Sequence, residues 1–306
     1  MHAPRPLVIA VTGPVYRLAL NRRMPARWGR PILDAAVVTQ RLPKGTVVRR
    51  ITLGGRPCER TTVGASERPR AILYLHGGGY TVGSARLFRA TAAYLACASG
   101  AVVYNLDYRL APEHAFPAAW VDAVAAFREL VAVHGFEPSR IAIAGDSAGG
   151  GLAVAAARTL TDEGLRPAAL ALLSPWTDPS NEDHEIERDF ATNKNWGRAS
   201  AALYRGDADP KDPRYAPMHG SLIGLPPMLI HYATTEMLRP EIQRFAALAS
   251  GADVDVELVE HPHLWHSAHV LAGTLRGATD AVTEAGAYLR TRLDAETAAA
   301  RVARTA

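Results

Sequence analysis

The sequence predicts an α/β fold built on a mostly parallel, doubly wound sheet of eight strands with helices on both faces. Short apolar or β-branched runs alternate with longer helical patterns from about residue 47 onward. The runs in the middle of the chain are apolar throughout, which is typical of strands covered on both faces. With 306 residues, 48% of them hydrophobic and 21% charged, the chain suits one large domain.

Eight strands and four intervening helices are expected in chain order. The strands are expected at residues 47–53, 58–63, 71–76, 101–108, 141–145, 169–174, 228–233 and 254–260. The helices are expected at residues 87–99, 117–134, 149–163 and 241–250. Because no helix separates the first two strands, we expect the sheet to begin with an antiparallel pair.

Two long segments interrupt this alternation and are expected to form a cap. Both contain helix-capable pieces, at residues 13–23 and 196–204. Long insertions on a rigid sheet usually cover a binding site. The chain is then expected to divide into an N-terminal part of the cap (1–45), a first part of the core (46–178), a cap insertion (179–225) and a second part of the core (226–306).

Composition and charge exclude several classes of protein. Two cysteines, Cys58 and Cys97, are too few for a disulfide framework, so a reducing compartment, the cytoplasm, is expected. The apolar run at residues 6–11 is too short for a signal peptide, and no stretch is long enough to span a membrane. No basic motif with interleaved aromatic residues indicates nucleic-acid binding.

The first fifty residues are strongly basic, with ten arginines or lysines and one acid, Asp34. The simplest interpretation is a solvated helical face that carries arginines on its polar side. Peripheral contact with anionic lipid or with an acidic substrate is the alternative interpretation.

The motif AGDSAGGG at residues 144–151 has the pattern Gly145-x-Ser147-x-Gly149. It follows an apolar strand and precedes a helix of small residues, which is the context of a nucleophile elbow. There a serine on a tight turn presents its hydroxyl above the sheet, and the helix N-terminus favours developing negative charge. The alternative is a glycine-rich turn in which Ser147 only caps the helix.

A second glycine-rich motif, LHGGGY at residues 75–80, ends another apolar strand. Consecutive glycines allow backbone N–H groups to converge on one point, as in an oxyanion hole. The expected donors are the amides of Gly78 and Gly79, joined by that of Ala148. A phosphate-binding loop is the competing interpretation, but the segment lacks the Gly-Lys-Ser/Thr ending that such loops require.

The motifs HGGGY, DYRLAPEHAFPAA (107–119) and GDSAGGG together resemble the bacterial hormone-sensitive-lipase family of α/β-hydrolases. The likeness runs in order from about residue 70 to 275 and includes SPWTD (174–178) and DPRYAP (212–217). It implies a serine carboxylesterase with a helical cap and no cofactor. It also implies a buried polar network that braces the oxyanion loop, made by Asp107, Arg109 and Glu113. Residues that support the motifs themselves are His76, Gly77 and Asp146.

The resemblance also places the acid of a catalytic triad, which in this fold follows the nucleophile and precedes the histidine. The segment TTEMLRPE (234–241) follows the seventh expected strand, and Glu236 stands where the family most often has aspartate. Because glutamate is one methylene longer, the loop must compensate for its reach. Asp178 and Glu241 are the alternatives.

Four histidines occur in the nine residues 261–269, HPHLWHSAH. Aligned with the family pattern of strand, proline, three residues and histidine, Pro262 sets the register and His266 becomes the catalytic base. A metal site is the competing interpretation, since His261, His263 and His269 also offer imidazoles. No H-E-x-x-H motif and no evident second shell support it, so no metal is expected.

The expected function is hydrolysis of short- to medium-chain acyl esters by Ser147, His266 and Glu236. Hydrolysis of amides or peptides by the same residues, or a non-catalytic receptor for a small ligand on the same fold, are the alternatives. Candidate pocket residues are Tyr80, Trp176 and Trp196. The family resemblance also suggests a homodimer formed through the edge of the last strand.

Overall fold

The computed structural model describes residues 2–35, 40–64, 69–181 and 186–305, with side chains up to residue 295. Its strands are β1 (Thr46–Leu53), β2 (Arg56–Val63), β3 (Ala71–Leu75), β4 (Val102–Leu106), β5 (Ile141–Asp146), β6 (Leu170–Leu173), β7 (Met228–Ala233) and β8 (Val256–His261). Its α-helices are α1 (Arg5–Ala19), α2 (Ala26–Ala35), α3 (Arg89–Ser99), α4 (Ala118–Ala132), α5 (Ala148–Asp162), α6 (Lys194–Arg205), α7 (Arg239–Gly251) and α8 (Arg276–Thr305). Short 3₁₀ helices are η2 (Pro138–Arg140), η3 (Pro217–His219) and η4 (Ala268–Leu271).

The eight strands form one sheet in the order β1-β2-β4-β3-β5-β6-β7-β8. β1 pairs antiparallel with β2, and β2 antiparallel with β4, whereas every other neighbouring pair is parallel. All residues of β3 to β7 are buried, as the continuous apolar runs predict. The predicted fold class, including the antiparallel start, is therefore confirmed.

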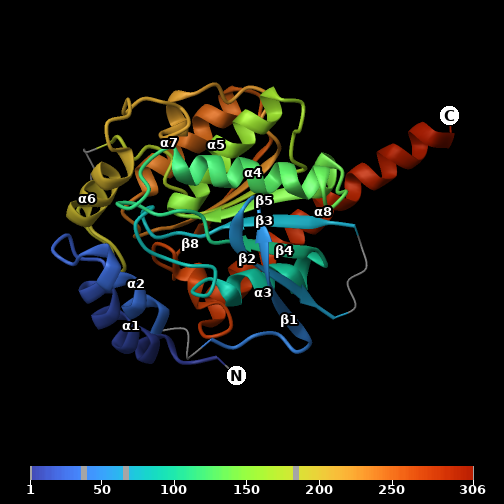
Figure 1. Ribbon diagram of the computed structural model, residues 1–306. Helices are drawn as coiled ribbons and strands as arrows, with labels where there is room; N and C mark the ends of the chain where they lie inside the picture. The colour runs from blue at the N-terminus through green and yellow to red at the C-terminus, as the bar shows by residue number, and fades with distance from the viewer. Residues whose placement is uncertain (1, 36–39, 65–68, 182–185, 306) are drawn as a thin grey trace.

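Helices cover both faces of the sheet (Figure 1), with α4, α5 and α7 on one face and α3 and α8 on the other. Fully buried side chains fill each layer, such as Phe127 and Phe245 on the first face and Leu95 and Leu289 on the second. Burying one such large apolar side chain contributes about 1.5–3 kcal/mol. The two layers hold the carboxyl ends of the parallel strands in place, and the candidate site lies at those ends.

The structure corrects the predicted bounds of the first helix and adds a helix at the end of the chain. α1 spans Arg5–Ala19, although the sequence suggested residues 13–23, because the helix continues through Gly13 and Pro14. Proline there removes only one backbone N–H donor, and the packing of the helix compensates. α8 went unpredicted because small residues dominate the first half of its buried face, where Ala278, Thr279, Ala281 and Ala285 give a weak apolar periodicity.

Helices α1, α2 and α6 lie together beside the sheet at one end of the molecule (Figure 1). The ring of Tyr16 in α1 meets Phe190 edge to face, with centroids 5.9 Å apart. The Asn193 side chain before α6 donates a hydrogen bond to the Leu20 carbonyl after α1. Among the described helices, none is both long enough and apolar enough to cross a membrane.

Candidate active site

Ser147 occupies a sharp turn between β5 and α5. Its backbone has φ 52° and ψ −118°, a conformation that L-residues rarely adopt. The flanking glycines permit this turn because a Cβ on Gly145 would lie 2.2 Å from the Gly149 carbonyl oxygen, and one on Gly149 would lie 2.0 Å from the Leu75 carbonyl oxygen. The predicted strand–turn–helix context of this serine is therefore present in the structure.

His266 lies in the loop after β8 and faces Ser147. The Ser147 Oγ is 2.9 Å from His266 Nε2, and His266 Nδ1 is 3.1 Å from Glu236 Oε2. A carboxylate can only accept a hydrogen bond, so Nδ1–H is the donor and Nε2 is left to receive the serine proton. Burial alone would lower the pKa of His266, but the hydrogen bond to Glu236 and nearby carboxylates outweigh it and raise the pKa to about 9.

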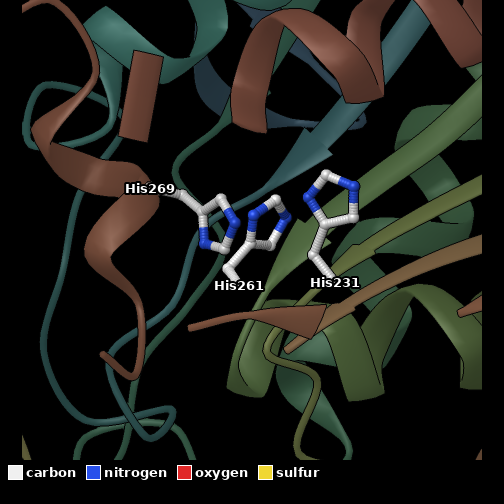
Figure 2. Close-up of side chains that lie close together, drawn as sticks. All are labelled: His231, His261 and His269. Carbon is white, nitrogen blue, oxygen red and sulfur yellow. The ribbon is translucent and has the colours of Figure 1, made fainter. Parts of the chain in front are cut away.

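The other histidines of residues 261–269 do not approach Ser147. His263 is exposed. His261 and His269 do not line the cavity of Ser147 and lie beside His231 of β7 (Figure 2). The four neighbouring histidines in the sequence therefore separate into different places in space.

Glu236 lies in the turn after β7 and is fully buried. The turn that carries Glu236 is also held by a residue of another segment, because the amide of Met237 donates a hydrogen bond of 3.0 Å to Asp189 Oδ2. Asp189 belongs to the segment between β6 and α6, and nothing in its sequence surroundings suggested this contact. It also contributes to the raised pKa of His266.

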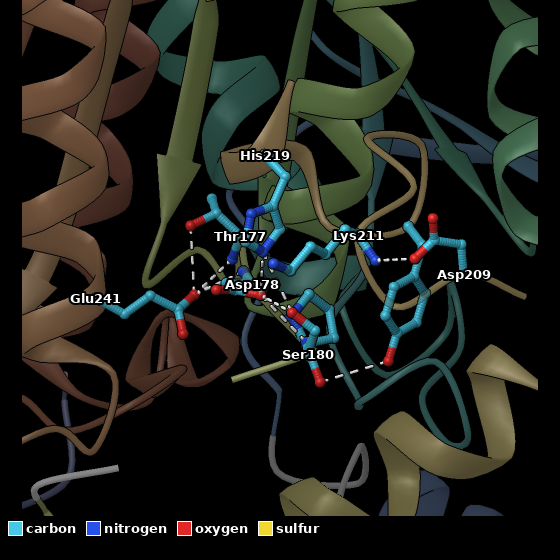
Figure 3. A network of polar contacts seen from close by, with 9 residues as sticks. Thr177, Asp178, Ser180, Asp209, Lys211, His219 and Glu241 are labelled. Carbon is cyan, nitrogen blue, oxygen red and sulfur yellow. Dashed lines mark hydrogen bonds and ion pairs between the residues drawn. The ribbon is translucent and has the colours of Figure 1, made fainter. Parts of the chain in front are cut away.

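The two alternative acids point elsewhere (Figure 3). Asp178 Oδ1 accepts a hydrogen bond of 3.2 Å from the Ser180 amide and lies 3.2 Å from His219 Nε2. Glu241 Oε1 accepts hydrogen bonds from the amides of Thr177 and Asp178 at 2.8 and 2.9 Å. These contacts tie the loop after β6 to α7, and burial raises the pKa of Glu241 to about 8. Glu236 is the acid that contacts His266.

The HGGG segment follows β3 and lies beside Ser147. Gly77 and Gly78 line the same cavity as Ser147, whereas Gly79 packs against Trp196 and Ser200 of α6. Among the described residues, the amides of Gly78, Gly79 and Ala148 donate no hydrogen bond to another protein group. Such amides are available to an anionic oxygen.

His76 and its neighbours fix the base of the glycine-rich segment. The His76 ring stacks on Tyr108 with centroids 4.3 Å apart, and the Tyr108 hydroxyl donates a hydrogen bond of 2.6 Å to the His76 carbonyl. Asp146 is held in turn by Ser267, whose hydroxyl donates a hydrogen bond of 2.6 Å to Asp146 Oδ1. Burial raises the pKa of Asp146 to about 7.

The expected buried network of Asp107, Arg109 and Glu113 takes a different form. Asp107 accepts a hydrogen bond from the Ala85 amide, and Arg109 makes a bidentate pair with Asp122. Glu113 is exposed because its partner, Arg30, comes from α2 at the surface. The three residues therefore make separate contacts, and the prediction of one buried network is wrong.

A largely apolar cavity of about 360 Å³ opens above Ser147 and His266. Trp196, one of the three candidate pocket residues, lines it. The other two are buried outside this lining, where Tyr80 stacks on Tyr204 with ring centroids 3.8 Å apart and Trp176 is packed next to Tyr80. Part of the cavity wall, not predicted residue by residue, comes from α1, α2 and the residue that follows α1: Val11, Thr12, Val15, Tyr16, Leu20, Ile32 and Leu33.

Comparison with known proteins agrees with this geometry. The family model described as α/β hydrolase fold matches residues 72–270. An acetyl-hydrolase of Streptomyces hygroscopicus is 40% identical over 253 residues, which is 78% of this chain and 84% of that protein. A crystal structure of an esterase from the bacterial hormone-sensitive-lipase family superposes with a TM-score of 0.88 and 36% identity, covering 95% of this chain and 99% of the other.

A crystal structure of EstE5 soaked with p-nitrophenyl butyrate superposes with a TM-score of 0.84 and 32% identity. This similarity covers 94% of this chain and 98% of that one. The chain belongs to the bacterial hormone-sensitive-lipase family of α/β-hydrolases and is a carboxylic ester hydrolase.

Proposed function

We propose that the chain is a serine carboxylesterase that hydrolyses short- to medium-chain acyl esters through an acyl-enzyme on Ser147. The observation that carries the proposal is the continuous hydrogen-bonded chain from the Ser147 hydroxyl through His266 to the buried Glu236. A serine hydroxyl is a poor nucleophile until a base accepts its proton, and the base needs a carboxylate that orients it. Both partners are in contact here.

The reaction proceeds in two similar halves. Ser147 Oγ attacks the ester carbonyl while His266 Nε2 takes its proton, and Glu236 stabilises the imidazolium that forms. The carbonyl oxygen becomes anionic and accepts hydrogen bonds from the amides of Gly78, Gly79 and Ala148. His266 then protonates the leaving alcohol, and water repeats the sequence on the acyl-enzyme. Loss of one oxyanion donor in such sites costs about 3 kcal/mol.

The size and lining of the cavity support a modest acyl chain. Its wall is largely apolar and includes side chains of α1, α2 and α6, so the substrate has few polar contacts beyond the reacting groups. We assign these helices to the cap expected from residues 1–45 and 179–225. Crystals of the similar protein EstE5 were soaked with p-nitrophenyl butyrate, so an ester with a four-carbon acyl chain is the natural first substrate to test.

The test is a series of p-nitrophenyl esters from acetyl to palmitoyl, assayed with wild type and Ser147→Ala. We expect kcat/KM to be highest among the short and medium chains and turnover to vanish in the alanine variant. A variant that still hydrolyses the esters would remove Ser147 from the mechanism. A wild type that binds esters without turnover would support a receptor, and faster cleavage of matched anilides than of esters would support an amidase.

A further inference from the structure

Three histidines from separate elements meet outside the cavity described above (Figure 2). His231 lies in β7, His261 ends β8 and His269 lies in η4. One ring nitrogen from each can be chosen so that all three atoms lie within 4.8 Å of one another. β7 and β8 are neighbouring parallel strands, so the pairing of the sheet brings the first two rings together.

The ring nitrogens of this histidine cluster have few partners. His231 and His269 are 0% and 2% exposed, and neither nitrogen of either ring makes a hydrogen bond with another described group. Nε2 of the half-buried His261 also lacks a partner. An imidazole always carries polar nitrogens, and leaving a buried polar atom unsatisfied is costly. These unpartnered nitrogens call for a ligand, and one ion shared by the three rings would satisfy one nitrogen of each.

Carboxylates lie next to the cluster on two sides. Glu284 of α8 places Oε2 3.6 Å from His231 Nε2 and 3.9 Å from His261 Nε2. Asp146 places Oδ2, which also lacks a hydrogen-bond partner, 3.9 Å from His269 Nδ1. Metal-binding histidines commonly have a carboxylate beside their second nitrogen, where it orients the ring.

We propose that His231, His261 and His269 bind one Zn²⁺ ion, with Glu284 as the fourth ligand. Three imidazoles and one carboxylate suit a tetrahedral zinc site, in which ligand atoms are separated by about 3.3 Å. The Glu284 oxygen is already near this separation from two of the nitrogens. Small ring rotations would bring the remaining nitrogens together.

The electrostatic surroundings suit a cation at this point. Burial and the neighbouring histidines lower the pKa of His231 well below its ordinary value and the pKa of His269 to about 3. These rings are therefore neutral at pH 7, and the neutral imidazole is the form that binds metals. Glu284, whose side chain is 47% exposed, gives the cluster a side facing solvent through which an ion can enter.

The proposed ion has a structural role. None of its four ligands is among the described residues that line the cavity of Ser147, so a metal here does not reach the ester. It joins β7, β8, η4 and α8, which flank the loop that carries His266. Bound Zn²⁺ is therefore expected to raise the melting temperature by stabilising the folded state that holds it.

The experiment uses untagged full-length protein that has been treated with chelator and then dialysed. Zn²⁺ is titrated in competition with a chromophoric chelator, thermal melting is followed with and without Zn²⁺, and Co²⁺ serves as a spectroscopic substitute. We expect one equivalent to bind at micromolar or lower free Zn²⁺, a rise in melting temperature, and the visible absorption bands of tetrahedral Co²⁺.

Two variants test the ligands against a matched control. His261 is half-buried, so the His261→Gln variant should fold. We expect this variant to lose both the stoichiometric binding of Zn²⁺ and the rise in melting temperature. His231→Leu removes the fully buried ligand, and its metal-free melting temperature reports whether it folds. The control is His263→Gln, which changes an exposed histidine two residues from His261 and should bind Zn²⁺ like wild type. Absence of stoichiometric binding by wild type, or equal binding by His261→Gln and His263→Gln, would overturn the proposal.

Discussion

Replacing Glu236 with glutamine tests the proposed role of this residue in a single pH profile. Glutamine keeps the size of the side chain and removes its charge. In the wild type, Glu236 and nearby carboxylates raise the pKa of the buried His266 to about 9, above the ordinary ~6.5 of histidine. Without the charge of Glu236, burial is no longer offset to the same extent, and burial lowers the pKa of histidine. We therefore expect the pKa of His266 to fall.

The size of the effect follows from the wild-type value. The difference between a pKa of about 9 and the ordinary ~6.5 corresponds to about 3 kcal/mol of stabilisation of the imidazolium. The transition state contains that imidazolium, and Glu236 is the largest of the groups that raise this pKa, with smaller contributions from Asp189 and Asp146. Losing the charge of Glu236 should therefore slow the reaction by up to about two powers of ten. Only neutral His266 can accept the serine proton. The kcat/KM of wild type should therefore fall as pH drops through the raised pKa, and the fall in Glu236→Gln should occur at lower pH.

The assay is hydrolysis of p-nitrophenyl butyrate across the pH range, with Ser147→Ala protein as the blank for spontaneous hydrolysis. Asp178→Asn is the matched control, since it removes the charge of the alternative acid that contacts Ser180 and His219 instead of His266. A Glu236→Gln variant with wild-type rate and an unchanged midpoint would refute the assignment. If Asp178→Asn instead loses activity and shifts the midpoint of the pH profile, Asp178 would be the acid that acts on His266.

Three further predictions concern the cavity wall, the loop brace and the core. Val15→Phe should lower kcat/KM for octanoyl relative to acetyl esters by about tenfold, because Val15 lines the cavity, and the exposed Leu18→Phe should leave the ratio unchanged. Arg30→Ala should lower the free energy of unfolding by about 1–2 kcal/mol, because its guanidinium donates hydrogen bonds to two backbone carbonyls, whereas Arg27→Ala should not. Leu289→Ala should lower the free energy of unfolding, measured by urea denaturation, by about 2–5 kcal/mol because the Leu289 side chain is fully buried. A smaller loss would contradict the packing of α8 on the sheet.

The sheet and the nucleophile turn were predictable because their signals are local. Five buried strands read as unbroken apolar runs, and Gly145 and Gly149 are required because a Cβ at either position would lie 2.2 Å or less from a backbone carbonyl oxygen. The bounds of α1 were not predictable in the same way, because the tertiary packing that keeps Pro14 inside a helix leaves no sequence mark. The helix α8 was missed for a related reason, since the small residues in the first half of its buried face contribute little to an apolar periodicity.

The contacts around the catalytic residues join segments that are far apart in the chain. A single sequence carries little information about such contacts. Asp189 holds the turn of Glu236 from 48 residues away. The cap was expected to cover the site, but which side chains of α1 and α2 enter the cavity wall depends on how these helices pack on the sheet. Tyr80, Trp176 and Trp196 were equally plausible pocket residues by sequence, but only Trp196 lines the cavity, whereas Tyr80 and Trp176 pack beside it in the core.

In the histidine-rich segment, neighbouring histidines have different proposed roles, with His266 as the catalytic base and His269 as a zinc ligand. His266 and His269 are three residues apart, and Asp146 lies between their surroundings: Ser267 donates a hydrogen bond to Asp146 Oδ1, and His269 Nδ1 lies 3.9 Å from Oδ2. Asp146 in turn precedes Ser147. The Asp146 carboxylate therefore contacts the loop that carries the proposed base and also borders the proposed zinc ligands. A metal at His269 would act on the reaction only through the position of this loop. We therefore expect it to change the stability of the loop and not the polarisation of the ester carbonyl.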